Sequence, residues 1–133
     1  MSQTIQLVWT GDFRFSGTGR GGTITAIDGN AEAGTTPVDL LLQSVGACAA
    51  TDVVDILKKS RQDVQGMAVE VEARRREEPP RHVKRLAFNF RIKGPVDQKK
   101  AERAVDLSLE KYCSVFHTLR MDIMLDVDVK IVA

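Results

Sequence analysis

The sequence predicts an α+β fold with the element order β-β-β-α-β-β-α-β and mostly antiparallel sheets. Apolar and polar residues alternate along several short stretches, which is typical of half-buried strands. One long apolar segment, residues 37–59, separates the first three of these stretches from the next two. A second helical pattern precedes the last stretch. Because strands and helices do not alternate strictly, a parallel α/β fold is not expected.

Composition narrows the class of protein. The chain has 133 residues, which predicts a single domain over residues 1–133. Hydrophobic residues make up 43% and aromatic residues only 5%, so aliphatic side chains must fill the core. A formal net charge of +1 argues against a nucleic-acid partner. The N-terminus lacks the basic and apolar regions of a secretory signal, so we expect a cytoplasmic protein without a membrane partner.

The first third of the chain is predicted to form three short strands. They cover residues 4–9, 13–16 and 22–27, and the first two are expected to pair as a hairpin. A glycine-rich loop, residues 17–22, joins the second strand to the third. This loop lacks the spacing of a P-loop or a dinucleotide fingerprint, so it is only a weak signal for phosphate binding.

Residues 37–59 are predicted to form the central helix. Thr35 or Thr36 fits the N-cap, and Pro37 fits the first turn, where no backbone N–H is needed. Apolar residues point all round its axis, so we expect a helix that is buried on all sides. One sheet covers only one side, and a second copy of the chain is the simplest source of the other cover. A membrane span is not expected, because polar residues interrupt the apolar run: Asp39, Gln43, Asp52 and Asp55.

The second half of the chain is predicted to contain three strands and a helix. Strands at residues 67–73 and 86–92 flank a charged hairpin, whose mixed signs indicate a solvated turn rather than a nucleic-acid patch. A helix is expected from Asp97 to Tyr112 or Cys113. The last strand covers residues 122–132. Its predicted inward face is Ile123, Leu125, Val127, Val129 and Ile131.

The two cysteines, Cys48 and Cys113, are the candidate reactive groups, and three interpretations stay open. In a reducing compartment a static structural bridge is not expected. The pair can be ordinary core residues, since free cysteine is often buried. It can be a redox pair, in which one thiolate is oxidised by peroxide and the other closes a disulfide. It can also be a metal site, formed by Cys113 and His117 with Cys48 or His82.

A reactive thiol needs a nearby positive charge to lower its pKa. Asp52 lies one helical turn after Cys48 and would oppose this if it pointed at the sulfur. The start of the helix is too far away for its dipole to help. The candidates are Arg20, in the glycine-rich loop, and Arg14, on a strand. The alternative for each is an ordinary solvated arginine.

Two segments together resemble the OsmC/Ohr family (osmotically inducible protein C and organic hydroperoxide resistance protein). The first is TTPVDLLLQSVGACAATDVVDILKKSRQDV and the second is ERAVDLSLEKYCSV. The P-x-[DE]-L-L…GxC helix and the later K-Y-C carry the match, and the order of strands and helices agrees. The resemblance implies an intertwined homodimer, in which sheets from both chains wrap the paired central helices.

The same resemblance implies a thiol peroxidase that acts on organic hydroperoxides at the subunit interface. By position, Cys48 is then the peroxidatic thiol and Cys113 the resolving one. Arg20 falls in the loop that carries the thiolate-stabilising arginine of the Ohr branch. A dithiol such as a lipoyl group, or a small thiol, recycles such an enzyme, and no cofactor is expected.

One position departs from the Ohr pattern. That branch usually has a glutamate directly after the helix-starting proline, where it holds the arginine, and here the position is Val38. The sequence is therefore closest to a less characterised branch of the family. The alternative function is a non-catalytic member that binds a small hydrophobic ligand in the interfacial pocket. A dimer with a purely structural role is the third hypothesis.

Overall fold

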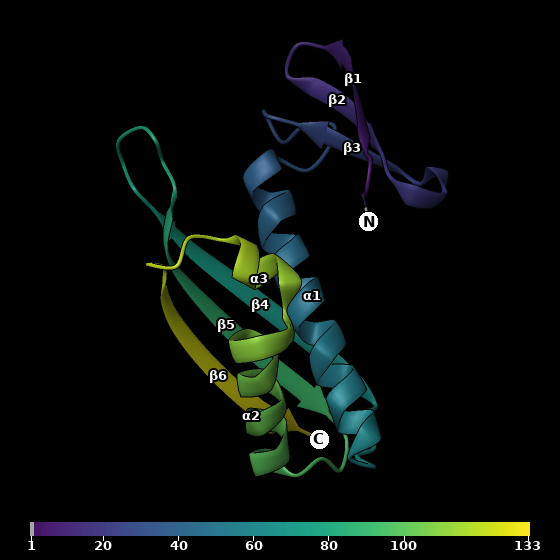
Figure 1. The fold of residues 1–133 in the computed structure, drawn as a ribbon, viewed down its shortest axis with the longest axis vertical. Helices are drawn as coiled ribbons and strands as arrows, with labels where there is room; N and C mark the ends of the chain where they lie inside the picture. Colours follow the sequence, from purple (N-terminus) through teal and green to yellow (C-terminus); the bar gives the residue numbers. More distant parts are fainter. Residues whose placement is uncertain (1) are drawn as a thin grey trace. The chain divides into compact units, whose positions relative to one another are not determined.

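The computed structural model describes residues 2–133, which fall into two compact units, residues 2–41 and Leu42–Ala133. Each unit contains one three-stranded sheet (Figure 1). In chain order the elements are β1 (Gln6–Gly11), β2 (Arg14–Thr18), the 3-10 turn η1 (Arg20–Gly22), β3 (Ile24–Asp28), α1 (Pro37–Lys59), β4 (Gly66–Arg75), β5 (Val83–Lys93), α2 (Gln98–Leu107), the π-helical segment η2 (Ser108–Tyr112), α3 (Ser114–Thr118) and β6 (Met124–Val132).

The predicted α+β class and the order of the main elements are confirmed. Three short elements were not predicted: η1, η2 and α3. The helix expected from Asp97 to Tyr112 or Cys113 ends earlier, because α2 stops at Leu107 and gives way to η2. There the N–H of Cys113 donates to the carbonyl of Ser108 at 2.7 Å, the i to i+5 bond that defines a π turn.

The sheet of the first unit has the order β1-β2-β3 and is antiparallel throughout. Its register pairs Trp9 with Phe15 and Phe15 with Ile27, while Leu7 pairs with Gly17. Paired residues point to the same face, so these side chains share one apolar face. Leu7 is 55% exposed and Trp9 65% exposed, so this unit by itself leaves much of the face uncovered.

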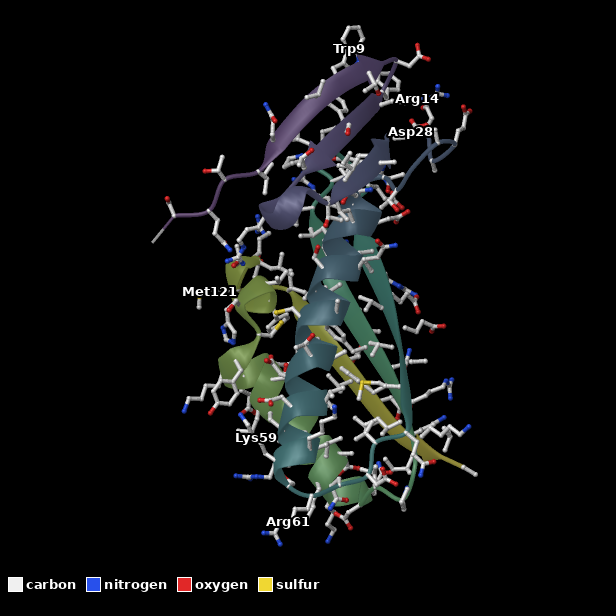
Figure 2. The ribbon with its side chains drawn as sticks, turned by 90° about the vertical axis from the view of Figure 1, so that its right-hand side faces the viewer. Trp9, Arg14, Asp28, Lys59, Arg61 and Met121 are labelled. Atoms are coloured by element: carbon white, nitrogen blue, oxygen red, sulfur yellow. The ribbon has the colours of Figure 1, made fainter. Side chains whose placement is uncertain are left out.

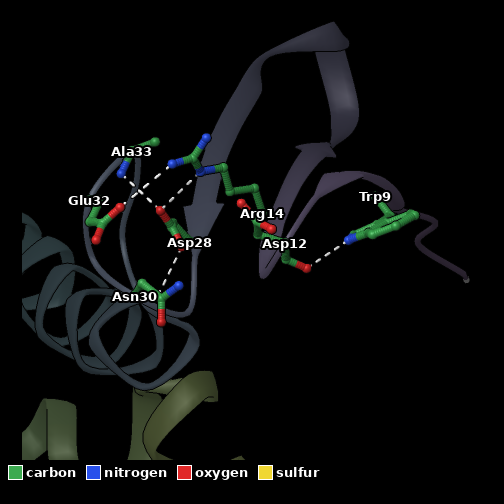
Figure 3. A network of polar contacts seen from close by, with 7 residues as sticks. All are labelled: Trp9, Asp12, Arg14, Asp28, Asn30, Glu32 and Ala33. Carbon is green, nitrogen blue, oxygen red and sulfur yellow. Dashed lines mark hydrogen bonds and ion pairs between the residues drawn. The ribbon is translucent and has the colours of Figure 1, made fainter.

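Asp28 fixes the loop that leads from β3 to α1 (Figure 3). Its carboxylate is 1% exposed and accepts the backbone N–H groups of Asn30 and Ala33, each at 2.9 Å. Arg14 adds an ion pair at 3.4 Å and also reaches Glu32 at 3.6 Å. The backbone N–H of Asn30, followed by that of Ala33, holds the pKa of the Asp28 carboxyl below its usual range.

We expect Asp28→Asn to lower the melting temperature by roughly 5 °C near neutral pH, because the amide loses the charge and one of the two acceptor oxygens. A carboxyl whose pKa is lowered by folding stabilises the protein above its unfolded pKa, and this stabilisation disappears as the pH falls through the folded pKa. The difference in melting temperature between wild type and variant should therefore be constant above about pH 5 and shrink towards acid. Circular dichroism melts across this range measure it. Asp12→Asn, on an exposed carboxylate of the same unit, is the control, and an equal difference for both variants at every pH would contradict the assignment.

The sheet of the second unit has the order β4-β5-β6. Strands β4 and β5 form an antiparallel hairpin, whereas β5 and β6 are parallel, which requires the crossover supplied by α2, η2 and α3. From Leu42 onward, α1 lies with α2 on one face of this sheet (Figure 1). The core between them is apolar and almost completely buried: Val45, Ala49, Val53 and Leu57 from α1, Leu86, Phe88, Phe90 and Ile92 from β5, and Ala101, Ala104 and Val105 from α2.

Within this chain the buried side of α1 is a single stripe, spaced by four residues from Val45 to Leu57, with Gly46 beside it. Ala47 and Thr51, on another side of the helix, are exposed. A second cover from another copy of the chain therefore stays a prediction. By length and composition alone, α1 is also the one helix among residues 2–133 that could cross a membrane, a test that soluble core helices pass as well.

The predicted helix boundaries have identifiable caps. The Thr36 hydroxyl accepts the N–H of Asp39 at 3.2 Å and caps α1. Of the two threonines predicted as candidates for the N-cap, it is therefore Thr36 that serves. At the other end of α1, Lys59 pairs with Asp55 at 2.9 Å, and Arg61 follows in the turn (Figure 2). Asp97 caps α2 by accepting the N–H of Lys100 at 2.9 Å.

Candidate active site

The structure brings Cys48 and Cys113 together within the second unit. Cys48 lies on α1 and is half-buried, and Cys113 follows η2 and is completely buried. Both are free thiols; the Cys113 thiol donates a long hydrogen bond to the carbonyl of Val45 at 4.0 Å, and Cys48 lies near enough to raise the pKa of Cys113. The Cys113 sulfur also accepts the N–H of Phe116 at 3.5 Å. Two groups far apart in the sequence thus form one polar cluster in an apolar core.

Local sequence explains how α1 holds its cysteine so close to the second unit's core. Gly46 faces β4, and a Cβ at this position would come within 2.9 Å of the Val71 side chain. The missing side chain therefore lets α1 pack closely against the sheet.

The surroundings of Cys113 keep its thiol protonated. Burial is the main cause that raises the pKa of this thiol, to about 11, and the N–H of Phe116 opposes it. The adjacent Cys48 and the negative charge of Asp52 raise the pKa further. Cys113 is therefore not an activated nucleophile at neutral pH, which suits a resolving thiol better than a peroxidatic one.

The role of Ser108 was not predicted from the sequence, although helical spacing places this serine on the same face as Ala101, Ala104 and Val105. This buried serine donates a hydrogen bond to the Asp52 carboxylate at 2.9 Å, and its hydroxyl lies 3.3 Å from the carbonyl of Ala49. Asp52 was expected to oppose a thiolate at Cys48. In the structure it bonds to Ser108 and raises the pKa of Cys113.

The two candidate arginines both belong to the first unit. Arg14 pairs with Asp28 and Glu32 and so has a structural role in the loop after β3. Arg20 opens the η1 turn and is exposed. Within residues 2–133 its guanidinium makes no ion pair and no hydrogen bond. Its proposed action on Cys48 stays a prediction.

The candidate metal ligands do not gather into a site. Among the residues that the structure describes, no group of three or more His, Cys, Asp or Glu side chains is placed to hold an ion. The ring of His117 packs edge-on against Phe116, with ring centroids 5.8 Å apart. His82 lies in the loop between β4 and β5, where it adds to the effect of Arg120 in lowering the pKa of Asp122.

An apolar cavity of about 540 Å³ lies in the first unit, over the uncovered face of its sheet. Its volume is within the range of small-molecule sites. The lining residues are Ile5, Leu7, Phe15, Gly17, Thr18, Gly19, Thr25, Ile27, Pro37 and Leu40.

Comparison with known proteins gives the family. The family model described as "OsmC-like protein" matches residues 28–128, which include both cysteines. The chain belongs to the OsmC-like family. Protein YhfA of Escherichia coli (strain K12) is 42% identical over 110 residues, which cover 80% of this chain and 81% of that protein.

Solved structures agree with this assignment. A hypothetical protein from Aquifex aeolicus VF5 superposes with a TM-score of 0.90 at 31% identity, over 100% of this chain and 99% of that one. The organic hydroperoxide resistance protein OhrB of Bacillus subtilis superposes with a TM-score of 0.63 at 17% identity, over 99% and 98% of the two chains. At that identity the OhrB likeness shows a shared fold.

Proposed function

We propose that this OsmC-like protein is a thiol-dependent peroxidase that reduces organic hydroperoxides, with Cys48 as the peroxidatic thiol and Cys113 as the resolving one. The observation that carries the proposal is the contact between a half-buried and a fully buried free thiol. The Bacillus subtilis protein with the same fold is an organic hydroperoxide resistance protein, and this supports organic hydroperoxides as the substrate class.

The first half of the reaction oxidises Cys48. Its thiolate attacks the terminal oxygen of the hydroperoxide, the O–O bond breaks, and the alkoxide takes a proton and leaves as the alcohol. Cys48 is now a sulfenic acid. The Cys113 sulfur then attacks the Cys48 sulfur, the S–S bond forms, and the S–O bond breaks. The hydroxide that leaves takes the proton of Cys113 and becomes water.

A dithiol completes the cycle. One of its thiolates attacks the Cys48–Cys113 disulfide, and its second thiol resolves the mixed disulfide, so that both protein thiols return and the reductant becomes a cyclic disulfide. A lipoyl group is the reductant we expect. A pair of small thiols supplies the same two electrons.

A homodimer would complete the site. The first unit exposes large apolar side chains on its sheet and just before it: Ile5, which precedes β1, is 64% exposed, Leu7 55% and Trp9 65%. Contiguous apolar surface of this kind marks an interaction face. We infer that a second copy covers it and that Arg20 supplies the positive charge that activates the Cys48 thiol.

Mass spectrometry of the protein treated with cumene hydroperoxide tests the function. Wild type should lose both free thiols and lose two hydrogens in mass, with a Cys48–Cys113 linked peptide after digestion. Cys113→Ser should instead gain one oxygen at Cys48, trapped by dimedone as the sulfenic acid. Cys48→Ser should keep its single thiol.

Unchanged free thiols in the wild type at stoichiometric peroxide would overturn the proposal.

The second candidate function, binding of a small hydrophobic ligand, is favoured by the apolar cavity of the first unit. It predicts that a fatty acid or similar apolar probe raises the melting temperature, and that this rise persists in Cys48→Ser. A ligand-dependent rise in melting temperature, together with thiols that do not react with peroxide, would favour the ligand-binding function.

A further inference from the structure

The Ser108–Asp52 contact joins the π-helical segment to α1 beside the two thiols. Asp52 lies one turn after Cys48 on α1, and Ser108 begins the π turn that ends at Cys113. The 2.9 Å hydrogen bond from the Ser108 hydroxyl therefore ties the Asp52 carboxylate to the segment that carries Cys113. Ser108 is fully buried, so this orientation is fixed by the core.

The fixed negative charge of Asp52 can influence which of the two thiols ionises. Only a thiolate reacts with peroxide, so the order of oxidation depends on which sulfur ionises. A carboxylate near one thiol disfavours its ionisation, since two like charges in a poorly solvated site repel each other. The reaction scheme proposed above gives Asp52 no role, because it uses only the two cysteines and an arginine.

We propose that the Asp52 carboxylate, oriented by Ser108, adds to burial in disfavouring the ionisation of Cys113 beside Cys48, and thereby makes Cys48 the thiol that peroxide oxidises first. Asp52 is a positioning residue in this scheme and touches no reacting atom. The role of Asp52 in catalysis rests on the peroxidase function proposed above. Its effect on the ionisation of Cys113 is exerted in the reduced protein, before any peroxide is present.

The groups that act on the ionisation of Cys113 come from α1 and from its own segment. On α1 they are the Cys48 thiol, the Asp52 carboxylate and the carbonyl of Val45, to which the Cys113 thiol donates at 4.0 Å. From α3 the N–H of Phe116 points at the sulfur. The core residues of β5 are apolar and contribute only by excluding water. Removing Cys48 therefore leaves Asp52 as the acidic side chain acting on Cys113.

Titration of the Cys113 thiolate by its absorbance near 240 nm, in the Cys48→Ser protein, tests the proposal. Cys113 is then the single thiol of the chain. Asp52→Asn keeps an oxygen that can accept the Ser108 hydrogen bond but removes the charge. We expect it to lower the pKa of Cys113 by about one unit, a roughly tenfold rise in thiolate at neutral pH. Ser108→Ala, which keeps the charge but frees the carboxylate, should lower the pKa by less.

Asp55→Asn is the matched control, because Asp55 is an exposed acid on the same helix that pairs with Lys59. It should leave the titration of Cys113 unchanged. Asp52→Ser provides a second neutral variant if Asp52→Asn does not fold, as judged by circular dichroism. A Cys113 pKa that stays the same or rises in the folded neutral variants overturns the proposal.

These titrations need no peroxide, so they succeed or fail independently of the peroxidase function. A second measurement connects the effect of Asp52 on Cys113 with the peroxidase function. In the protein with both cysteines, Asp52→Asn should close the disulfide about tenfold faster from the Cys48 sulfenic acid at neutral pH, since more Cys113 is ionised. Slower closure would show that Asp52 acts as a base instead and would also overturn the proposal.

Discussion

Cys48→Ser is expected to reduce the rate of organic hydroperoxide reduction by about 10³-fold or more, because it removes the nucleophile that the peroxide oxygen must meet. Cys113→Ser should behave differently. It keeps the first chemical step and forms the sulfenic acid once, but it stops before disulfide closure. Turnover with a dithiol should then fall, while a burst of one peroxide per chain remains. A stopped assay of residual cumene hydroperoxide measures both quantities.

Lys58→Ser is the matched control for this experiment. It places the same hydroxymethyl group on the same helix, at an exposed charged position near the end of the helix. Its activity should stay within about twofold of wild type, since surface substitutions rarely have large effects. Equal losses in Lys58→Ser and Cys48→Ser would assign the effect to the helix rather than to the sulfur. Full activity in Cys48→Ser would remove this cysteine from the mechanism.

Leu7→Lys is expected to weaken the proposed homodimer by at least about 100-fold, because a second chain that covers this face would have to bury an unpaired charge. Leu7 lies on the apolar face of the first unit's sheet and is 55% exposed in the single chain. Analytical ultracentrifugation should find the wild type at twice the 14.7 kDa mass of the chain and the variant shifted towards that mass. If the site needs both subunits, peroxide reduction should fall with the dimer fraction.

Met121→Lys adds the same charge at a position that is fully exposed, at 102%. It should leave the sedimentation of the wild type unchanged. A wild type that sediments as a monomer at micromolar concentration would contradict the dimer. Dissociation by Met121→Lys as well would indicate a general effect of charge rather than a contact at Leu7.

Alternation along the chain was enough to predict the strands of the second unit. Leu86, Phe88, Phe90 and Ile92 were predicted to point inward, and all four are completely buried. The last strand illustrates the limit of such a pattern. Ile123, Val129 and Ile131 pack against the core as expected, whereas Leu125 and Val127 remain 38% exposed in the single chain. Periodicity gives the side of a strand, but how much of that side is covered depends on neighbouring elements.

Caps were also predictable, because they depend on a few neighbouring residues. Thr36 and Asp97 cap their helices through their own side chains. The π turn before Cys113 was not predictable in this way. Its sequence, SLEKY, is compatible with an ordinary helix, and the wider turn appears in a segment whose Ser108 hydroxyl bonds to Asp52 on a different helix.

The sequence by itself determined the fold class, the central helix and the two cysteines as candidate reactive groups, because each depends on local periodicity, capping and residue chemistry. Only the tertiary structure decided that Cys113 contacts Cys48, that β5 and β6 run parallel, and that Ser108 and Asp52 join the same cluster. These features depend on contacts between segments far apart in the chain. These contacts form because the segments pack into one core. Burial in that core also raises the pKa of the Cys113 thiol.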